Sequence, residues 1–263
     1  MTTVDFITEL FCRIDEAMRE VPKHPQAHLY PSEVVTLALL FALKGGGERA
    51  FYRWLARDYR PLFPRVPERT RLFRLFATHQ DWTQRFLAQP TVLGVADSYG
   101  VELLHPYREK RRPLPERIGR KGLSNHRWIV GGKLAVVLNQ WGLVCGWAAE
   151  TATVHDSAFQ PLIARFATQM VVLADENFAR REGNPPTLKV CPRGTWNDRM
   201  LVETTFSMLT LICHAKKAIH RAWSSFTMRL AFSVALFNVL VQWDGLSFDE
   251  DGCVHRSIAQ FSL

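Results

Sequence analysis

The hydrophobic pattern changes its period near residue 90, and this change constrains the fold more than any other feature of the chain. Before it, the apolar residues of Phe6–Met18 recur at helical spacing. Pro31 and Ser32 favour the start of a helix over Val34–Lys44, and the glycines that follow favour its end. Residues 1–90 are therefore expected to form a helical region.

After residue 90 the apolar residues come in short runs of the kind that strands show. These runs are Thr91–Ala96, Lys133–Leu138, Leu143–Ala149, Met170–Ala174 and the shorter Leu188–Cys191. Helices are expected over Ser157–Thr168 and from Asn197 or Asp198 to Cys213. The mixture predicts an α/β domain over residues 91–243, in which helices flank a mixed sheet, followed by an acidic surface tail over residues 244–263.

The apolar segment Ser224–Trp243 is long enough to cross a bilayer. Arg229 lies inside it, and a charge near the middle of a span is costly, so we interpret the segment as a buried core helix without membrane contact. The N-terminus lacks the form of a signal peptide. The five cysteines are scattered, with no pair at metal-binding spacing. A cytoplasmic location is predicted.

The chain is basic, with 33 Lys and Arg against 25 Asp and Glu and a net charge of +8. This excess favours a polyanionic partner, with nucleic acid the first candidate. The spacing of Arg49, Arg53, Arg57 and Arg60 puts them on one face of a helix. That face is either simply solvated or in contact with phosphates, and composition leaves both readings open.

Two further basic clusters lie in the predicted α/β domain. The first is a proline- and glycine-containing loop region, predicted to clamp DNA, whose candidates are Arg108, Arg111, Arg112, Lys121 and Lys133. The second is Lys216-Lys217, which lies between two expected helices and either contacts phosphates or caps helix ends.

Three acidic residues stand out by their positions. Asp97 and Asp175 each follow a short apolar run, and ligands gather at strand ends in open α/β sheets, although a lone aspartate there is commonly a turn former or a helix cap. Glu203 lies in a mostly apolar helix, where it is exposed, paired with Arg199 one turn earlier, or bound to a cation. Together they suit Mg²⁺ or Mn²⁺, which prefer oxygen ligands and act in pairs on phosphodiesters.

The chain resembles the DDE transposases of bacterial insertion sequences over nearly its whole length. The resemblance rests on the order and spacing of five blocks: Ala96–Gly100, Lys121–Ser124 with Gly132–Leu134, Thr151–Asp156, Leu173–Phe178 and Arg199–Phe206. It implies an RNase H-like catalytic core of the retroviral integrase superfamily. It also implies DNA strand cleavage and strand transfer at the ends of an insertion sequence.

The resemblance assigns roles to individual residues. Asp97, Asp175 and Glu203 would hold two Mg²⁺ or Mn²⁺ ions. Arg199 would contact a phosphate near the scissile bond, and Trp196 takes the place of a family tyrosine. The implied partners are the terminal inverted repeats, read mainly by the N-terminal helical region, and target DNA. A homodimer in the active complex and a nucleoid-associated location in a bacterium are also implied.

The chain departs from the family at two places. Thr210 stands where the extended signature has a lysine, and Glu176-Asn177 stands where Lys-Gly is frequent. Two alternatives therefore stay open. One is a catalytically inactive DNA-binding relic or regulator, and the other is a structure-specific nuclease of the same fold.

Overall fold

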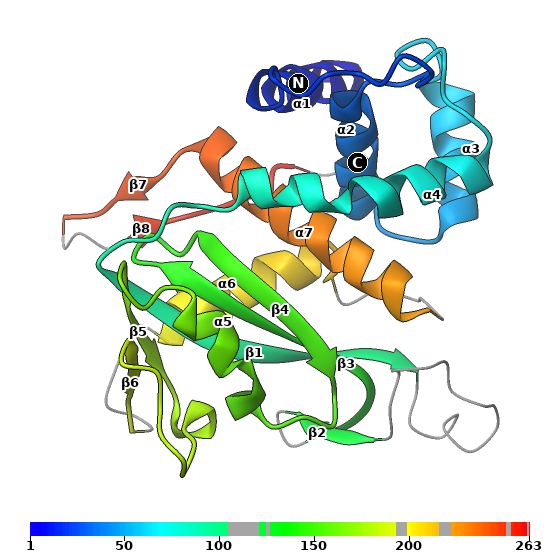
Figure 1. Cartoon of the computed structure of the whole chain (residues 1–263). Helices are drawn as coiled ribbons and strands as arrows, with labels where there is room; N and C mark the ends of the chain where they lie inside the picture. The colour runs from blue at the N-terminus through cyan, green and yellow to red at the C-terminus, as the bar shows by residue number, and fades with distance from the viewer. Residues whose placement is uncertain (105–120, 125–126, 193–198, 216–221, 251–253, 262) are drawn as a thin grey trace.

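The computed structural model describes the chain except for residues 105–120, 125–126, 193–198, 216–221, 251–253 and 262 (Figure 1). The α-helices are α1 (Thr3–Ala17), α2 (Pro31–Lys44), α3 (Glu48–Asp58), α4 (Arg69–His79), α5 (Gln160–Ala164), α6 (Arg199–Leu211) and α7 (Trp223–Asp244). The strands are β1 (Leu93–Leu104), β2 (Gly122–Ser124), β3 (Arg127–Asn139), β4 (Val144–Thr151), β5 (Val171–Ala174), β6 (Leu188–Val190), β7 (Ser247–Phe248) and β8 (Val254–His255). Short 3₁₀ helices are η1 (Gln80–Phe86), η3 (Asp156–Phe159) and η4 (Glu176–Phe178).

The described elements before residue 90 are all helical, as the sequence predicted. The first helix begins with a capping box, in which the side chain of Thr2 accepts from the Asp5 amide and Asp5 accepts from the Thr2 amide. α2 is buried continuously from Val34 to Leu43, since it packs against α1 on one side and α7 on the other. α2 is therefore the centre of the helical region.

The long helix α7 lies between the helical region and the sheet (Figure 1). Within the described part of the chain it is the one helix with the length and hydropathy of a membrane span, yet 78% of that window is buried inside the protein. Its Arg229 donates from Nη1 to the carbonyl of Gly46 at 3.0 Å and lies over the ring of Phe41. The prediction of a buried core helix is confirmed.

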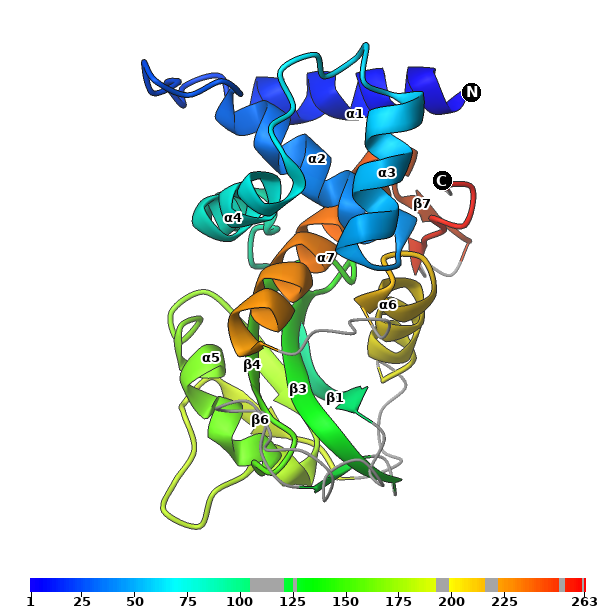
Figure 2. The same ribbon diagram turned by 90° about the vertical axis from the view of Figure 1, so that its right-hand side faces the viewer.

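The sheet is mixed, as expected, with strand order β2-β3-β1-β5-β6 and β4 also paired with β3. β1 runs antiparallel to β3 and parallel to β5, and β6 continues the parallel part. The turn between β3 and β4 is built by Asn139, whose Oδ1 accepts from the amides of Trp141 and Leu143. Figure 2 shows α6 and α7 on one side of the strands and α5 on the other.

Alternation along β1 sends its side chains into two separate cores. Val95 and Val101 belong to the large core shared with α6, α7 and the N-terminal helices. Ala96 belongs to a smaller core shared with α5 and β5. Because successive strand residues face opposite ways, Asp97 and Tyr99 share the α6 face, whereas Ser98 shares the α5 face.

Two boundaries differ from the sequence prediction. β1 runs on through Asp97 to Leu104, because this whole stretch pairs with β3, so the first aspartate lies inside a strand rather than at its end. The helix expected over Ser157–Thr168 is split into η3 and the short α5, and its cap is His155, which accepts from the Ser157 amide.

The prediction of an acidic surface tail over residues 244–263 is wrong for its last part. Ile258 and Phe261 are buried in the main core. The ring of Phe261 lies 5.1 Å from that of Trp243 and 5.9 Å from that of Phe6. Burial of these apolar side chains holds the segment against α1 and α7, although the acidic residues before it suggested solvent.

Candidate active site

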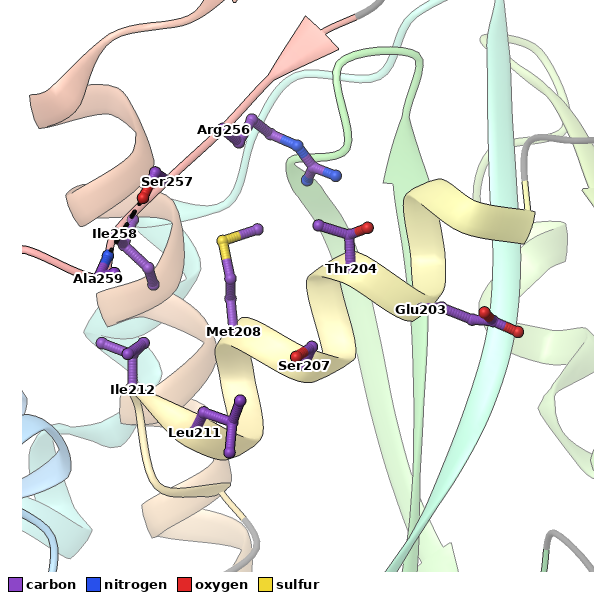
Figure 3. Close-up of a pocket in the computed structure, with 10 residues that line it drawn as sticks. All are labelled: Glu203, Thr204, Ser207, Met208, Leu211, Ile212, Arg256, Ser257, Ile258 and Ala259. Carbon is purple, nitrogen blue, oxygen red and sulfur yellow. Dashed lines mark hydrogen bonds between the residues drawn. The ribbon is translucent and has the colours of Figure 1, made fainter.

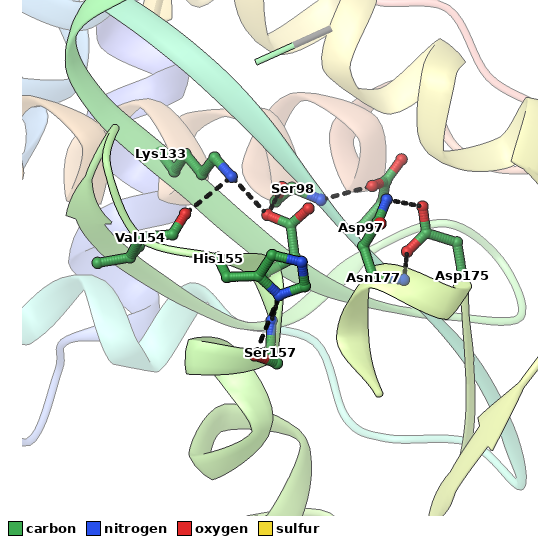
Figure 4. A network of polar contacts seen from close by, with 9 residues as sticks. Asp97, Ser98, Lys133, Val154, His155, Ser157, Asp175 and Asn177 are labelled. Atoms are coloured by element: carbon green, nitrogen blue, oxygen red, sulfur yellow. Dashed lines mark hydrogen bonds and ion pairs between the residues drawn. The ribbon is translucent and has the colours of Figure 1, made fainter. Parts of the chain in front are cut away.

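The register of the parallel strands aligns the two predicted catalytic aspartates. Gly94 on β1 pairs with Val172 on β5, and Val95 pairs with Leu173. Two residues further along the same register, Asp97 lies level with Asp175. Residues level with each other on neighbouring parallel strands face the same side of a sheet. The carboxylates therefore lie side by side on the α6 face, as Figure 4 shows.

Backbone and amide donors orient both carboxylates (Figure 4). Asp97 accepts through Oδ1 from the backbone amide of Ser98 at 2.7 Å. Asp175 caps η4, accepting through Oδ1 from the Asn177 backbone at 3.0 Å and through Oδ2 from the Asn177 side chain at 3.1 Å. Both aspartates are only partly buried.

Glu203 reaches the same face of the sheet from α6. The helix packs on β1, where the ring of Phe206 lies 5.3 Å from the ring of Tyr99. Glu203 is exposed and precedes Phe206 by about one helical turn, so it shares that side of the helix. Figure 3 shows its side chain projecting from α6, where it also lines the groove between this helix and the C-terminal segment.

The three acids suit a hard divalent cation by their chemistry, since they offer only carboxylate oxygens. Their present spacing is open. Among the described residues, no three His, Cys, Asp or Glu side chains are gathered closely enough to hold a metal ion. The structure thus brings Asp97 and Asp175 together and places Glu203 over the same face of the sheet. The three carboxylates do not form one ligand cluster in this conformation.

Lys133 occupies a different place from the one predicted. It was expected to contact DNA, but its side chain is only 8% exposed and its ammonium is 2.9 Å from Oδ1 of Asp156. The same ammonium donates to the carbonyl of Val154 at 3.0 Å. Because alternation along β3 turns Lys133 to the α5 face, it lies on the other side of the sheet from the three acids.

Sequence reasoning missed the partners of Lys133. Asp156 accepts hydrogen bonds from both Lys133 and Ser98. The available signal was a single lysine within the apolar run of β3, because a buried charge requires a partner of opposite sign.

The predicted DNA-contact residues divide into two groups. Arg53 and Arg57 are exposed on α3, and Lys121 is exposed just before β2. Arg57 is also 2.6 Å from Asp58, and this bond lowers the pKa of that carboxyl below its usual value. Outside the described residues lie Arg108, Arg111, Arg112, Trp196, Lys216 and Lys217, together with the side chain of Arg199, the first residue of α6.

A groove with a volume of about 420 Å³ separates α6 from the C-terminal segment (Figure 3). Arg256 crosses it at one end, donating to Oγ1 of Thr205 and to the carbonyls of Gly142 and Leu201. Burial lowers the pKa of Arg256 to about 10. This arginine therefore ties the C-terminal segment, α6 and the β3–β4 turn together, and so holds the helix that presents Glu203.

Comparisons with protein-family models, with curated proteins and with solved structures found no match for this chain.

Proposed function

We propose that this chain is a DDE-type DNA transposase of a bacterial insertion sequence, with an RNase H-like catalytic domain in residues 91–243. The observation that carries the proposal is the strand register that brings Asp97 level with Asp175. The mixed sheet supports it, because β1 has an antiparallel neighbour on one side and a parallel neighbour on the other. So does the position of Glu203 on the helix that packs over the same face.

Asp97, Asp175 and Glu203 would hold two Mg²⁺ or Mn²⁺ ions. When bound, such a pair activates the attacking oxygen and stabilises the leaving oxygen of a phosphodiester. The residues of the chain supply orientation. The Ser98 amide fixes one oxygen of Asp97, and Asn177 fixes both oxygens of Asp175. For all three carboxylates to bind the same pair of ions, α6 would bring Glu203 closer to Asp97 and Asp175.

The remaining features of the proposal concern DNA. A net charge of +8 favours binding to the phosphate backbone. Arg53 and Arg57 expose their side chains on α3, which suits phosphate contact by the helical region as it binds the terminal inverted repeats. Arg199 starts α6 one turn before Glu203, where it would contact a phosphate near the reacting bond. Handling two ends together with target DNA implies a homodimer acting on the bacterial nucleoid.

The test is cleavage of linear DNA that carries the ends of the element, with Mg²⁺ or Mn²⁺ as the added metal. Wild type is expected to cut at the ends and to join the released 3′-hydroxyl to a second DNA. Asp97→Asn, Asp175→Asn and Glu203→Gln should each abolish cutting while leaving DNA binding intact. Glu20→Gln is the matched control, since it removes one exposed carboxylate far from the acids in sequence.

Each alternative has its own outcome in this assay. Tight, salt-sensitive binding without cleavage by any variant would identify an inactive DNA-binding relic or regulator. Cleavage of branched DNA without end dependence or strand joining would identify a structure-specific nuclease. Cleavage that survives Asp97→Asn would refute the assignment of the acids.

A further inference from the structure

A partly buried polar network lies on the face of β1 opposite Asp97, Asp175 and Glu203. Oδ1 of Asp156 accepts from Oγ of Ser98 at 2.6 Å and from Nζ of Lys133 at 2.9 Å. Nζ of Lys133 also donates to the carbonyl of Val154 at 3.0 Å. The side chains of Lys133 and Asp156 are 8% and 17% exposed. The network thus joins β1, β3 and the loop after β4 beneath the sheet.

Ser98 connects this network to the acidic face. Its hydroxyl donates to Asp156 on the α5 face, while its backbone amide donates to Oδ1 of Asp97 at 2.7 Å on the α6 face. Figure 4 shows the chain of contacts running from Lys133 to Asp97. Because the hydroxyl is anchored to a partly buried ion pair, the rotamer of Ser98 and the direction of its amide are held. The direction of that amide in turn sets the orientation of the Asp97 carboxylate.

Stability alone does not account for the network. A buried ion pair is weak support for folding, because desolvation of the two charges offsets their attraction, and an apolar pair of similar volume is often equally stable. Such a pair instead fixes the orientation of the side chains that it contacts, because its hydrogen bonds are directional and each donor has a defined acceptor.

We propose that Lys133, Asp156 and Ser98 are positioning residues that hold the Asp97 carboxylate ready for a divalent cation. The inference rests on the proposed function, because it assumes that Asp97 is a metal ligand. Partners behind a ligand typically change metal affinity or activity by about 10–100-fold when they are removed. The network acts in this way on Asp97, through the backbone of Ser98.

The experiment measures Mn²⁺ binding to the full chain by the loss of the electron paramagnetic resonance signal of free Mn²⁺. Ser98→Ala keeps the backbone amide and removes only its anchor, so an affinity loss of about 10-fold is expected. The double variant Lys133→Met/Asp156→Leu removes both charges together and leaves no buried ion unpaired, and it should show a similar loss. Thr153→Ala is the matched control, since it removes a hydroxyl bonded to Thr151 in the same loop and should leave the affinity unchanged.

Coupling between the variants separates positioning from general loosening. Ser98→Ala added to the double variant should cause little further loss, because all three residues act through one contact. Thermal melting followed by circular dichroism should show folded variants at the temperature of the binding measurement.

The outcomes distinguish the two proposals. If wild type binds Mn²⁺, Asp97→Asn loses it, and both network variants bind like wild type, the positioning role is overturned and the metal site stands. If neither wild type nor Asp97→Asn binds Mn²⁺, both the proposed function and this inference are refuted.

Discussion

The buried side chain of Asn238 makes the attachment of the helical region to the sheet testable. It lies on α7 with no solvent exposure. Its Oδ1 accepts from the Val144 amide at 2.9 Å, and its Nδ2 donates to the carbonyls of Phe86 and Val144 at 2.8 Å each. One amide group therefore joins α7, the end of η1 and the start of β4.

The magnitude of the effect of Asn238→Ala follows from counting the groups that lose a partner. The Val144 amide and the Phe86 carbonyl each lose this hydrogen bond, whereas the Val144 carbonyl still accepts from the Ala88 amide. Each buried group left unsatisfied costs about 1–3 kcal/mol, so the variant should lose about 2–6 kcal/mol of unfolding free energy. Against a typical total of about 5–15 kcal/mol, this loss is large.

The assay is urea unfolding followed by circular dichroism, with the free energy taken from the midpoint and slope by linear extrapolation. Gln242→Ala is the matched control, because Gln242 lies one turn further along α7 and is exposed. It should change the free energy by less than about 0.5 kcal/mol. A loss below about 1 kcal/mol for Asn238→Ala would refute the argument that this side chain joins the three elements.

Three further predictions concern burial and ionisation. Phe261→Ala should lower the unfolding free energy by about 3 kcal/mol in urea titrations, because the ring packs on two other aromatic rings. An unchanged free energy would show that the C-terminal segment is exposed, as the sequence had predicted. Arg229→Met should have an unfolding free energy about 1–2 kcal/mol higher than that of the parent at pH 8. Burial lowers the pKa of Arg229 to about 10, a desolvation cost of roughly 3 kcal/mol, which exceeds the contribution of its hydrogen bond to Gly46 and its contact with the Phe41 ring. This advantage should shrink above pH 10, where the folded parent releases a proton that the unfolded chain still holds, and an advantage that grows with pH would contradict it. A thiol reagent should modify the exposed thiol of Cys12 rapidly and that of Cys213 only on unfolding, since Cys213 is buried and burial raises its pKa. Equal rates of modification for the two cysteines in the native protein would contradict the burial of Cys213.

The elements that depend on local pattern could be predicted from the sequence. The helices near Phe6–Met18 and Val34–Lys44 follow from the spacing of apolar residues, and β1, β3, β4, β5 and β6 follow from short apolar runs. The burial of α7 follows from Arg229 in a segment otherwise long enough to span a membrane. Local composition also marked Asp97, Asp175 and Glu203 as unusual, because acids are rare within or directly after apolar runs.

Contacts between distant segments could not be read from the sequence. The extension of β1 beyond Asp97 depends on pairing with β3, and strand pairing is a property of two segments together. The burial of Ile258 and Phe261 depends on packing against apolar side chains of α1 and α7, which are distant in the sequence.

By itself, the sequence determined the main helices of the first ninety residues, the strand runs after them and the acidic residues that are out of place, because periodicity and side-chain chemistry act over a few neighbouring residues. Only the tertiary structure decided that Asp97 lies level with Asp175, because that depends on the register between β1 and β5. It also decided that Lys133 faces away from the acids and pairs with Asp156. A one-residue change in register would turn every side chain of the shifted strand to the opposite face, so the pairing of distant segments decides which side chains meet.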